Sequence, residues 1–183
     1  MKISLHICCA VCAAGAAERL IQEGCTIEGY FFNPNLYPEG EYLRRLENAQ
    51  RVAREMGFAL TEGPRNFSDW DAAVAGLENE PEGGARCAVC FKFRLVQTYR
   101  FMQKSGCEAF ATTLTMGSNK PGILINQLGS EIGGLRFLSR DFKKKGGFQR
   151  AGQLAGKWGL YRQHYCGCRY SLKEMENRYE KKQ

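Results

Sequence analysis

Short apolar runs alternate along this chain with longer stretches in which apolar residues recur every three or four positions. The runs predict strands at 2–8, 26–32, 58–61, 109–113 and 135–138, and the stretches predict helices at 10–23, 40–56, 68–78, 88–104, 121–131 and 148–158, with one more at the carboxyl end. Strands that alternate with helices form βαβ crossovers. The pattern therefore predicts a single α/β domain, in which helices flank a mostly parallel, Rossmann-like sheet.

The stretch at 40–56 is the most clearly amphipathic part of the chain. Tyr42, Leu46 and Ala49 share its apolar face, and its arginines are expected on the opposite, solvent side. No repeat, low-complexity segment or linker interrupts the sequence. Since 183 residues can bury a core of their own, we expect one metal-binding catalytic domain over 1–183.

Seven of the nine cysteines stand in three tight groups. These are Cys8, Cys9 and Cys12, then Cys87 and Cys90, then Cys166 and Cys168. Thiols two or three residues apart can point at one centre, and soft thiolates bind zinc, copper(I) or iron–sulfur clusters. A structural zinc or a single cubane cluster uses at most four thiolates. Seven thiols are therefore enough for a second metal, or for redox thiols beside a cluster.

Disulfide bonds are the competing interpretation of these cysteines. The amino-terminal segment lacks the pattern of a secretory signal, and no apolar run has the length of a membrane span. We therefore expect a cytoplasmic protein without disulfides or membrane contact, in which clustered thiols serve metal or redox chemistry. Cys25 and Cys107 stand alone in apolar surroundings and are expected to pack as small hydrophobic residues.

The first cysteine group follows the first strand and opens the first helix, which is where open α/β sheets bind ligands. A helix amino terminus also favours thiolate over thiol. A glycine-rich phosphate loop would stand here in nucleotide-binding proteins of this topology, but this chain has cysteines and alanines with Gly15 alone. We therefore expect a metal site at the carboxyl edge of the sheet and no dependence on ATP.

The net charge of +7 is unevenly distributed along the chain. Residues 136–183 contain 13 Lys and Arg against 4 Asp and Glu, whereas residues 1–135 contain 13 against 15. Such a basic segment attracts an anionic polymer, and aromatic residues among its cations can stack on unpaired bases. Charge alone would fit a solvated surface equally well.

Longer motifs resemble one known family. They lie at 5–9, 29–35, 41–45, 82–91, 112–115, 141–144 and 160–168, within a match that extends over about 3–171. The combination of CC, RCxxCF and LYRQxYCGC is far more specific than any single Cys-x-x-Cys pair. It resembles epoxyqueuosine reductase of the QueH type, the cobalamin-independent form.

The resemblance implies a fold of the HUP, or adenine-nucleotide-hydrolase-like, type and the last step of queuosine synthesis. In that step two electrons and two protons convert the epoxide on the cyclopentane ring of epoxyqueuosine, at the tRNA wobble position, into an alkene and water. The family is associated with an iron–sulfur cluster, here expected to be 4Fe–4S, and a neighbouring thiolate-bound iron. The expected partners are tRNA carrying epoxyqueuosine and an external low-potential electron donor, with the protein acting as a monomer.

The resemblance makes the clustered cysteines the expected ligands of both centres. They are Cys8, Cys9, Cys12, Cys87, Cys90, Cys166 and Cys168. A proline usually precedes the third position of the family's CCxxC motif, where this chain has Val11, and that third position is not always cysteine. Whether Cys12 is a ligand stays open, as does the division of the other cysteines between the two centres.

Further site residues follow from the chemistry. The oxygen leaves as water and needs a proton donor, for which the candidates are Asp141, Tyr161, His164 and His6. His6 fits a hydrogen-bonded core residue better than an acid. Thr112, Thr113 and Lys120 follow a strand at the same edge and either hold the ribose or base or end the sheet with hydrogen bonds. Phosphates of the anticodon arm are expected on Lys143, Lys144, Lys145 and Arg150.

Two other functions compete with this interpretation. A zinc-ribbon-like RNA-binding module would need four thiolates and the basic segment, but it leaves three clustered cysteines and a full α/β domain unexplained. A thiol–disulfide oxidoreductase would use Cys87 and Cys90, yet such motifs normally follow an early strand rather than open a helix in mid-chain. The metal content distinguishes the three functions: iron with sulfide for the reductase, zinc for the RNA-binding module and no metal for the thiol–disulfide oxidoreductase.

Overall fold

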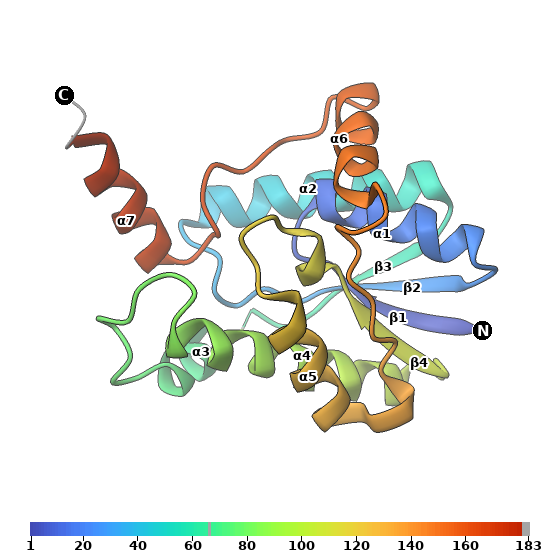
Figure 1. The fold of residues 1–183 in the computed structure, drawn as a ribbon, viewed down its shortest axis with the longest axis horizontal. Coiled ribbons are helices and arrows are strands. Elements are labelled where there is room, and N and C mark those ends of the chain that lie inside the picture. Colours follow the sequence, from blue (N-terminus) through green and yellow to red (C-terminus); the bar gives the residue numbers. More distant parts are fainter. Residues whose placement is uncertain (66, 181–183) are drawn as a thin grey trace.

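The structure, a computed structural model, describes residues 1–65 and 67–180 and has a four-stranded sheet at its centre (Figure 1). The strands are β1 (Lys2–His6), β2 (Thr26–Phe31), β3 (Ala59–Glu62) and β4 (Ala109–Thr112). They are parallel and lie in the order β3-β2-β1-β4. The predicted single α/β domain with a parallel sheet is thereby confirmed.

Helices cover both faces of the sheet (Figure 1). On one face lie α1 (Ala10–Gln22), α2 (Glu39–Met56) and α6 (Gly147–Lys157), and on the other lie α4 (Ala85–Lys104) and α5 (Gly122–Gly133). The short helix α3 (Phe67–Ala73) and the last helix α7 (Arg169–Glu180) lie beyond the carboxyl edge of the strands. That edge is therefore enclosed by segments from both halves of the chain.

The core is densest where α1 packs between the sheet and α6. The alanines of α1 are buried, and their small side chains allow close approach of neighbouring elements. At Gly15 a Cβ atom would lie 2.8 Å from Cβ of Ala151 on α6 and 2.9 Å from Cε of Met116. Only glycine fits this crossing without a shift of α6. Cys107 is buried and Cys25 packs against the same core, as predicted for both.

Three predicted elements differ in the structure. Residues 135–138 do not form a strand, because Gly134 turns the chain at φ +53° into a 3₁₀ helix (Gly134–Arg136) and only Phe137 bridges to Phe110. The helix expected at 68–78 ends at Ala73, and Gly76 with φ +80° continues the chain as turns. Finally, α4 begins three residues earlier than predicted, at Ala85, so both cysteines of the second group lie within it.

All nine cysteines are free thiols, and none of them is joined in a disulfide in the part of the chain that the structure describes. Within residues 1–65 and 67–180, no helix has the length and the apolar composition that crossing a membrane requires.

Candidate metal centre

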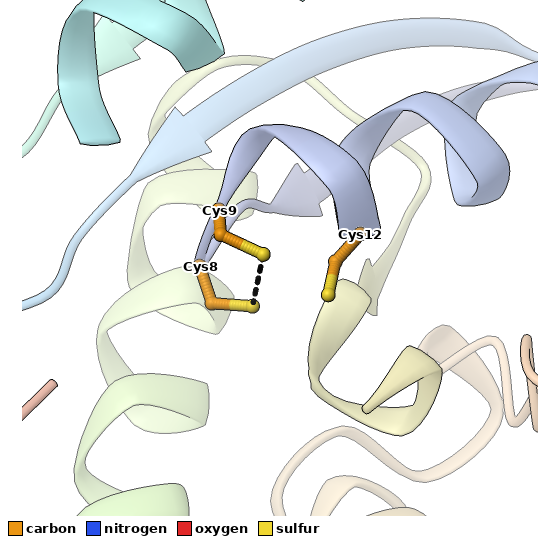
Figure 2. A group of neighbouring side chains, drawn as sticks. All are labelled: Cys8, Cys9 and Cys12. Carbon is orange, nitrogen blue, oxygen red and sulfur yellow. Dashed lines mark hydrogen bonds between the residues drawn. The ribbon is translucent and has the colours of Figure 1, made fainter. Parts of the chain in front are cut away.

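Cys8, Cys9 and Cys12 form a compact group that we call the thiol triad (Figure 2). Cys8 follows β1, Cys9 is the residue before α1, and Cys12 lies in the first turn of that helix. Their sulfur atoms all lie within 4.8 Å of one another, with 3.9 Å between those of Cys8 and Cys9, and all three residues are buried. Thiolates about 2.3 Å from one ion would be spaced by nearly such distances. The triad can hold a metal with little movement.

Hydrogen bonds fix the triad and shape its charge. The Thr113 hydroxyl accepts from the Cys8 amide at 3.1 Å and donates to the Cys8 sulfur at 3.3 Å, and the Gln163 side-chain amide donates to the Cys9 sulfur at 3.2 Å. Hydrogen bonds from Cys12 and Cys9 lower the pKa of Cys8 well below its ordinary value, whereas hydrogen bonds with Cys8 and Cys9, together with burial, raise the pKa of Cys12. Without a metal, the triad thus concentrates negative charge on Cys8.

His6, two residues before Cys8, is a buried link between strands. One ring nitrogen, Nδ1, lies 2.9 Å from the Thr112 hydroxyl, and the other, Nε2, lies 3.1 Å from the carbonyl oxygen of Phe32. Burial and the nearby Arg94 lower the pKa of His6 to about 3. The ring is therefore neutral, with Nε2–H donating to the carbonyl and Nδ1 accepting from the hydroxyl. This matches the core role favoured for His6.

The remaining four cysteines, which we call the second cysteine set, come from two distant segments. Cys87 and Cys90 lie in the first turns of α4, Cys166 lies in the loop before α7, and Cys168 directly precedes that helix. Cys90 and Cys168 pack in one buried cluster with Trp70. Over residues 1–65 and 67–180, no three of these sulfur atoms lie within 4.8 Å of one another. The sulfur atoms of the second cysteine set are thus spaced more widely than those of the triad.

Two cations lie among the cysteines. The ammonium of Lys120 donates to the Cys166 sulfur at 3.1 Å. Burial lowers the pKa of Lys120, but its interactions with Cys166 and Cys8 outweigh burial and raise that pKa above its ordinary value. The buried guanidinium of Arg94, one turn after Cys90 on α4, donates to the side-chain oxygens of Asn33 and Asn35 at 3.1 Å each. Within the described ranges neither cation is paired with a carboxylate. Since a buried charge requires compensation, the thiolates are their natural counterions.

Arg45 fixes the loop of the second cysteine set. It is only 3% exposed, so the expectation that the arginines of α2 face solvent is wrong for this residue. Its guanidinium donates to a Glu41 carboxylate oxygen at 2.6 Å, to the carbonyl of Cys166 at 2.9 Å and to that of Tyr165 at 3.0 Å. Gly167 has φ +125°, and a Cβ there would lie 2.9 Å from Nη1 of Arg45. This buried contact clamps residues 165–168 onto α2.

Besides His6, the three candidate proton donors make no hydrogen bond to sulfur in the part of the chain described. The Tyr161 hydroxyl donates to the second carboxylate oxygen of Glu41 at 2.8 Å. Asp141 lies beside the start of α5, with an oxygen 3.6 Å from the Lys143 ammonium. His164 is exposed. Their assignment as proton donors stays a prediction.

The four predicted phosphate-binding residues differ in their surroundings. Arg150 forms a two-pronged ion pair with Glu18 of α1, at 2.7 and 2.6 Å. Lys143 donates to the carbonyl of Lys120 at 3.0 Å in addition to its contact with Asp141. Lys144 and Lys145 are exposed. Of these four residues, only Lys144 and Lys145 have no ion pair within the described ranges.

Comparison with known proteins identifies the family. The sequence profile described as "Epoxyqueuosine reductase QueH" matches residues 3–174. The chain belongs to this family, which is one of oxidoreductases. Proteins named epoxyqueuosine reductase QueH include one from Streptococcus pyogenes serotype M1, 37% identical over 182 residues, which cover 94% of this chain and 71% of that protein. The corresponding protein of Thermotoga maritima is 32% identical over 183 residues, 97% of this chain and 93% of that protein.

The QueH match includes residues whose role the sequence did not reveal. Arg45 and Gln163 stand inside motifs that carry the family resemblance, but a motif does not show which side chains turn inward. Arg94 had a clearer signal. It follows Cys90 by four residues on a predicted helix, so both had to lie on one face. A basic residue four positions after a cysteine on a predicted helix thus helps to predict a buried site, because the two side chains share one face of the helix.

Proposed function

We propose that this protein reduces epoxyqueuosine to queuosine at the wobble position of tRNA. Family membership supports the reaction class, and the compact thiol triad supports a metal-dependent mechanism. Two electrons and two protons enter, both carbon–oxygen bonds of the epoxide break, and an alkene and water leave. The two electrons would come from an external low-potential donor by way of a bound cofactor.

The observation that carries the proposal is the pairing of many thiols with cations that have no carboxylate partner. Arg94 and Lys120 are suited to a site whose contents carry negative charge, as thiolate-bound iron does. We assign the seven clustered cysteines to a 4Fe–4S cluster and a neighbouring iron. When bound, such groups supply single electrons at low potential and a Lewis acid for the epoxide oxygen.

The chain's own residues would hold these groups and move the proton. Lys120 and Arg94 balance thiolate charge, and Gln163 orients Cys9. Asp141, Tyr161 and His164 remain our candidates for delivering the proton to the departing oxygen. His164 is the freest of the three, because it is exposed beside Cys166 along the chain. Tyr161 would first have to leave Glu41.

The wider assignments belong to the same proposal. We place the fold in the HUP, or adenine-nucleotide-hydrolase-like, type, with one metal-binding catalytic domain over 1–183 and its site at the carboxyl edge of the sheet. The basic segment 136–183 would bind the tRNA, and the protein would work as a cytoplasmic monomer. The alternating helices and parallel strands support the fold type.

Anaerobic purification tests the proposed cofactors directly. We expect brown protein that contains iron and acid-labile sulfide and whose absorption bleaches on reduction. Cys90→Ala should lose most of that colour, whereas Cys107→Ala, a buried cysteine of the core, should keep it. With a chemical reductant the wild type should convert epoxyqueuosine in tRNA to queuosine, measured by nucleoside mass spectrometry. Colourless protein with stoichiometric zinc would overturn the proposal.

Salt dependence tests the tRNA surface. Lys144→Ala/Lys145→Ala should reduce the slope of log affinity against log salt by roughly 0.7–0.9 for each lost phosphate contact. Lys143 and Arg150 should matter less, because each already has a partner within the protein. Lys92→Ala/Lys104→Ala removes two exposed lysines from α4 and is the matched control. An unchanged slope in the first variant would place the tRNA on another face.

A further inference from the structure

A cavity of about 260 Å³ is lined by Cys12, one member of the thiol triad. It lies between the start of α1, the loop at 117–118, α6 and the segment at 162–163. The residues that matter for its chemistry are Cys12, Ser118, Phe148, Gly152, Arg162 and Gln163. Cys12 joins the cavity to the triad. Gln163 does so as well, because its side chain lines the cavity and donates to the Cys9 sulfur at 3.2 Å.

The wall formed by α6 has features of a base-binding surface. Phe148 is 52% exposed, although it lines this cavity and phenylalanine normally buries its ring. Arg162 lies along the same wall, where Nη2 donates to the carbonyl of Gly152 at 2.8 Å. Aromatic rings and guanidinium planes are the two surfaces on which proteins stack unpaired bases of RNA.

The neighbouring basic residues lie on the other side of the same helix. Lys144 and Lys145 immediately precede α6 and, with Gly15 and Glu18 of α1, line a separate depression. Phe148 follows Lys145 by three residues, so one short segment presents cations toward one side and an aromatic ring toward the other. The two lysines and Phe148 thus belong to one stretch at the start of α6, which favours a backbone phosphate on the lysines together with a base at the cavity.

We infer that the modified base of the tRNA binds in this cavity, stacked on Phe148, with its cyclopentane ring directed toward Cys12. The inference rests on the proposed function and adds to it a site for the substrate. The cavity is smaller than typical sites for drug-sized ligands, which measure about 300–1,000 Å³, so it suits one base rather than a whole nucleotide. Ser118 and Gln163 provide polar groups for the base edge.

Two glycines of α6 offer a matched pair of variants. Gly152 lines the cavity, and a Cβ there would meet only Nη2 of Arg162, at an ordinary 3.7 Å. Gly156, one turn later, is exposed, and a Cβ there would meet nothing within 4 Å. Leucine at either position improves helix propensity, so both variants should fold. Gly152→Leu fills the cavity, whereas Gly156→Leu leaves it open.

The test is binding of two anticodon hairpins to the metal-loaded protein, one with epoxyqueuosine and one with guanosine at the wobble position. Wild type and Gly156→Leu should prefer the epoxyqueuosine hairpin. Gly152→Leu should bind it about 5- to 150-fold more weakly, the range for loss of one base–aromatic stack. Phe148→Ala should show a loss in the same range and Phe148→Trp should restore affinity, while iron content stays unchanged in all variants.

Equal binding of the epoxyqueuosine hairpin by Gly152→Leu and Gly156→Leu would overturn the inference. So would equal binding of the two hairpins by the wild type. Because the readout is affinity, these outcomes are separate from the proposed reaction. Failure of the wild type to form queuosine would refute the proposed function instead, and loss of affinity in Gly152→Leu would still identify the base-binding cavity.

Discussion

The thiol triad and the second cysteine set are built at very different ranges along the chain. The triad spans five residues, from Cys8 to Cys12, at the junction of one strand and one helix. The second cysteine set joins the start of α4 to a loop some 80 residues later, and it depends on Arg45 of α2 to hold that loop. One set is thus a product of local geometry, and the other of tertiary contacts.

This difference indicates which contacts maintain the geometry of each set. The triad is buried at the junction of β1 and α1, so its geometry should persist as long as the sheet does. The loop with Cys166 and Cys168 is fixed by a buried ion pair and two carbonyl contacts, so one substitution on another helix can release it. The two sets should therefore lose their order independently.

The largest effect is expected from Arg45→Ala. Removing the guanidinium leaves Glu41 buried without its counterion and frees two carbonyl groups, which should cost about 3–5 kcal/mol in the free energy of unfolding. Urea denaturation measures the loss. In the metal-free protein, alkylation of Cys166 should accelerate while that of Cys9 stays slow. Arg51→Ala, on the exposed side of α2, should change stability by no more than about 0.5 kcal/mol.

A smaller loss is expected when the buried link between strands is removed by His6→Leu. The Phe32 carbonyl and the Thr112 hydroxyl would each lose a buried partner, at a combined cost of about 2–4 kcal/mol. Thermal unfolding of the metal-free protein measures this cost. Ser4→Ala is the control on the same strand and face, because its buried hydroxyl has no partner among the described residues and should not be missed. Equal stability of the two variants would contradict a supporting role for His6.

Thr113→Val should act within the triad itself. The substitution keeps the shape but leaves the Cys8 amide without its acceptor, which should cost about 1–3 kcal/mol. Alkylation of Cys8 in the metal-free protein should change in rate, while that of Cys166 should not. Thr61→Val on the exposed part of β3 provides the comparison. If Cys166 responded as strongly as Cys8, the two sets would not be independent.

The smallest effect concerns the ion pair that joins α6 to α1. A hydrogen bond from Arg150 lowers the pKa of Glu18, so the pair stabilises the fold above the ordinary carboxyl pKa and is lost as pH falls through the lowered value. At pH 7, Glu18→Gln should lose up to about 1 kcal/mol, as is usual for an exposed pair. Denaturation of both proteins should show this gap closing below about pH 4, near the ordinary carboxyl pKa. A gap that persisted at pH 3 would point to packing instead of charge.

Much of the fold followed from the sequence because periodicity is a local signal. The first two strands and their helices lie within a few residues of their predicted bounds, since β-branched runs and apolar faces are visible without the rest of the chain. Residues 135–138 misled because an apolar run does not reveal whether an adjacent strand is available. Leu135 is fully exposed there, and only Phe137 turns toward the sheet.

The site was predicted in the same unequal way. Close spacing was enough to bring Cys8, Cys9 and Cys12 together, because a strand end and one helical turn fix their positions. Sequence spacing could not show that Arg45 would be buried, because Arg45 hydrogen-bonds to carbonyl groups about 120 residues further along the chain. Nor could charge distinguish Arg150, already paired, from the exposed Lys144.

The contact at Gly15 has a consequence for how this enzyme can change. Ala151 and Met116, the two side chains that a Cβ at Gly15 would strike, both form walls of the cavity beside Cys12. The width of that cavity is therefore set by the absence of a side chain one turn along the thiol-bearing helix. On the base-binding role inferred for this cavity, a mutation there would change how the base fits without contacting it. The requirement at Gly15 is for a small residue and not for a reactive one. A search restricted to reactive side chains would therefore miss this position.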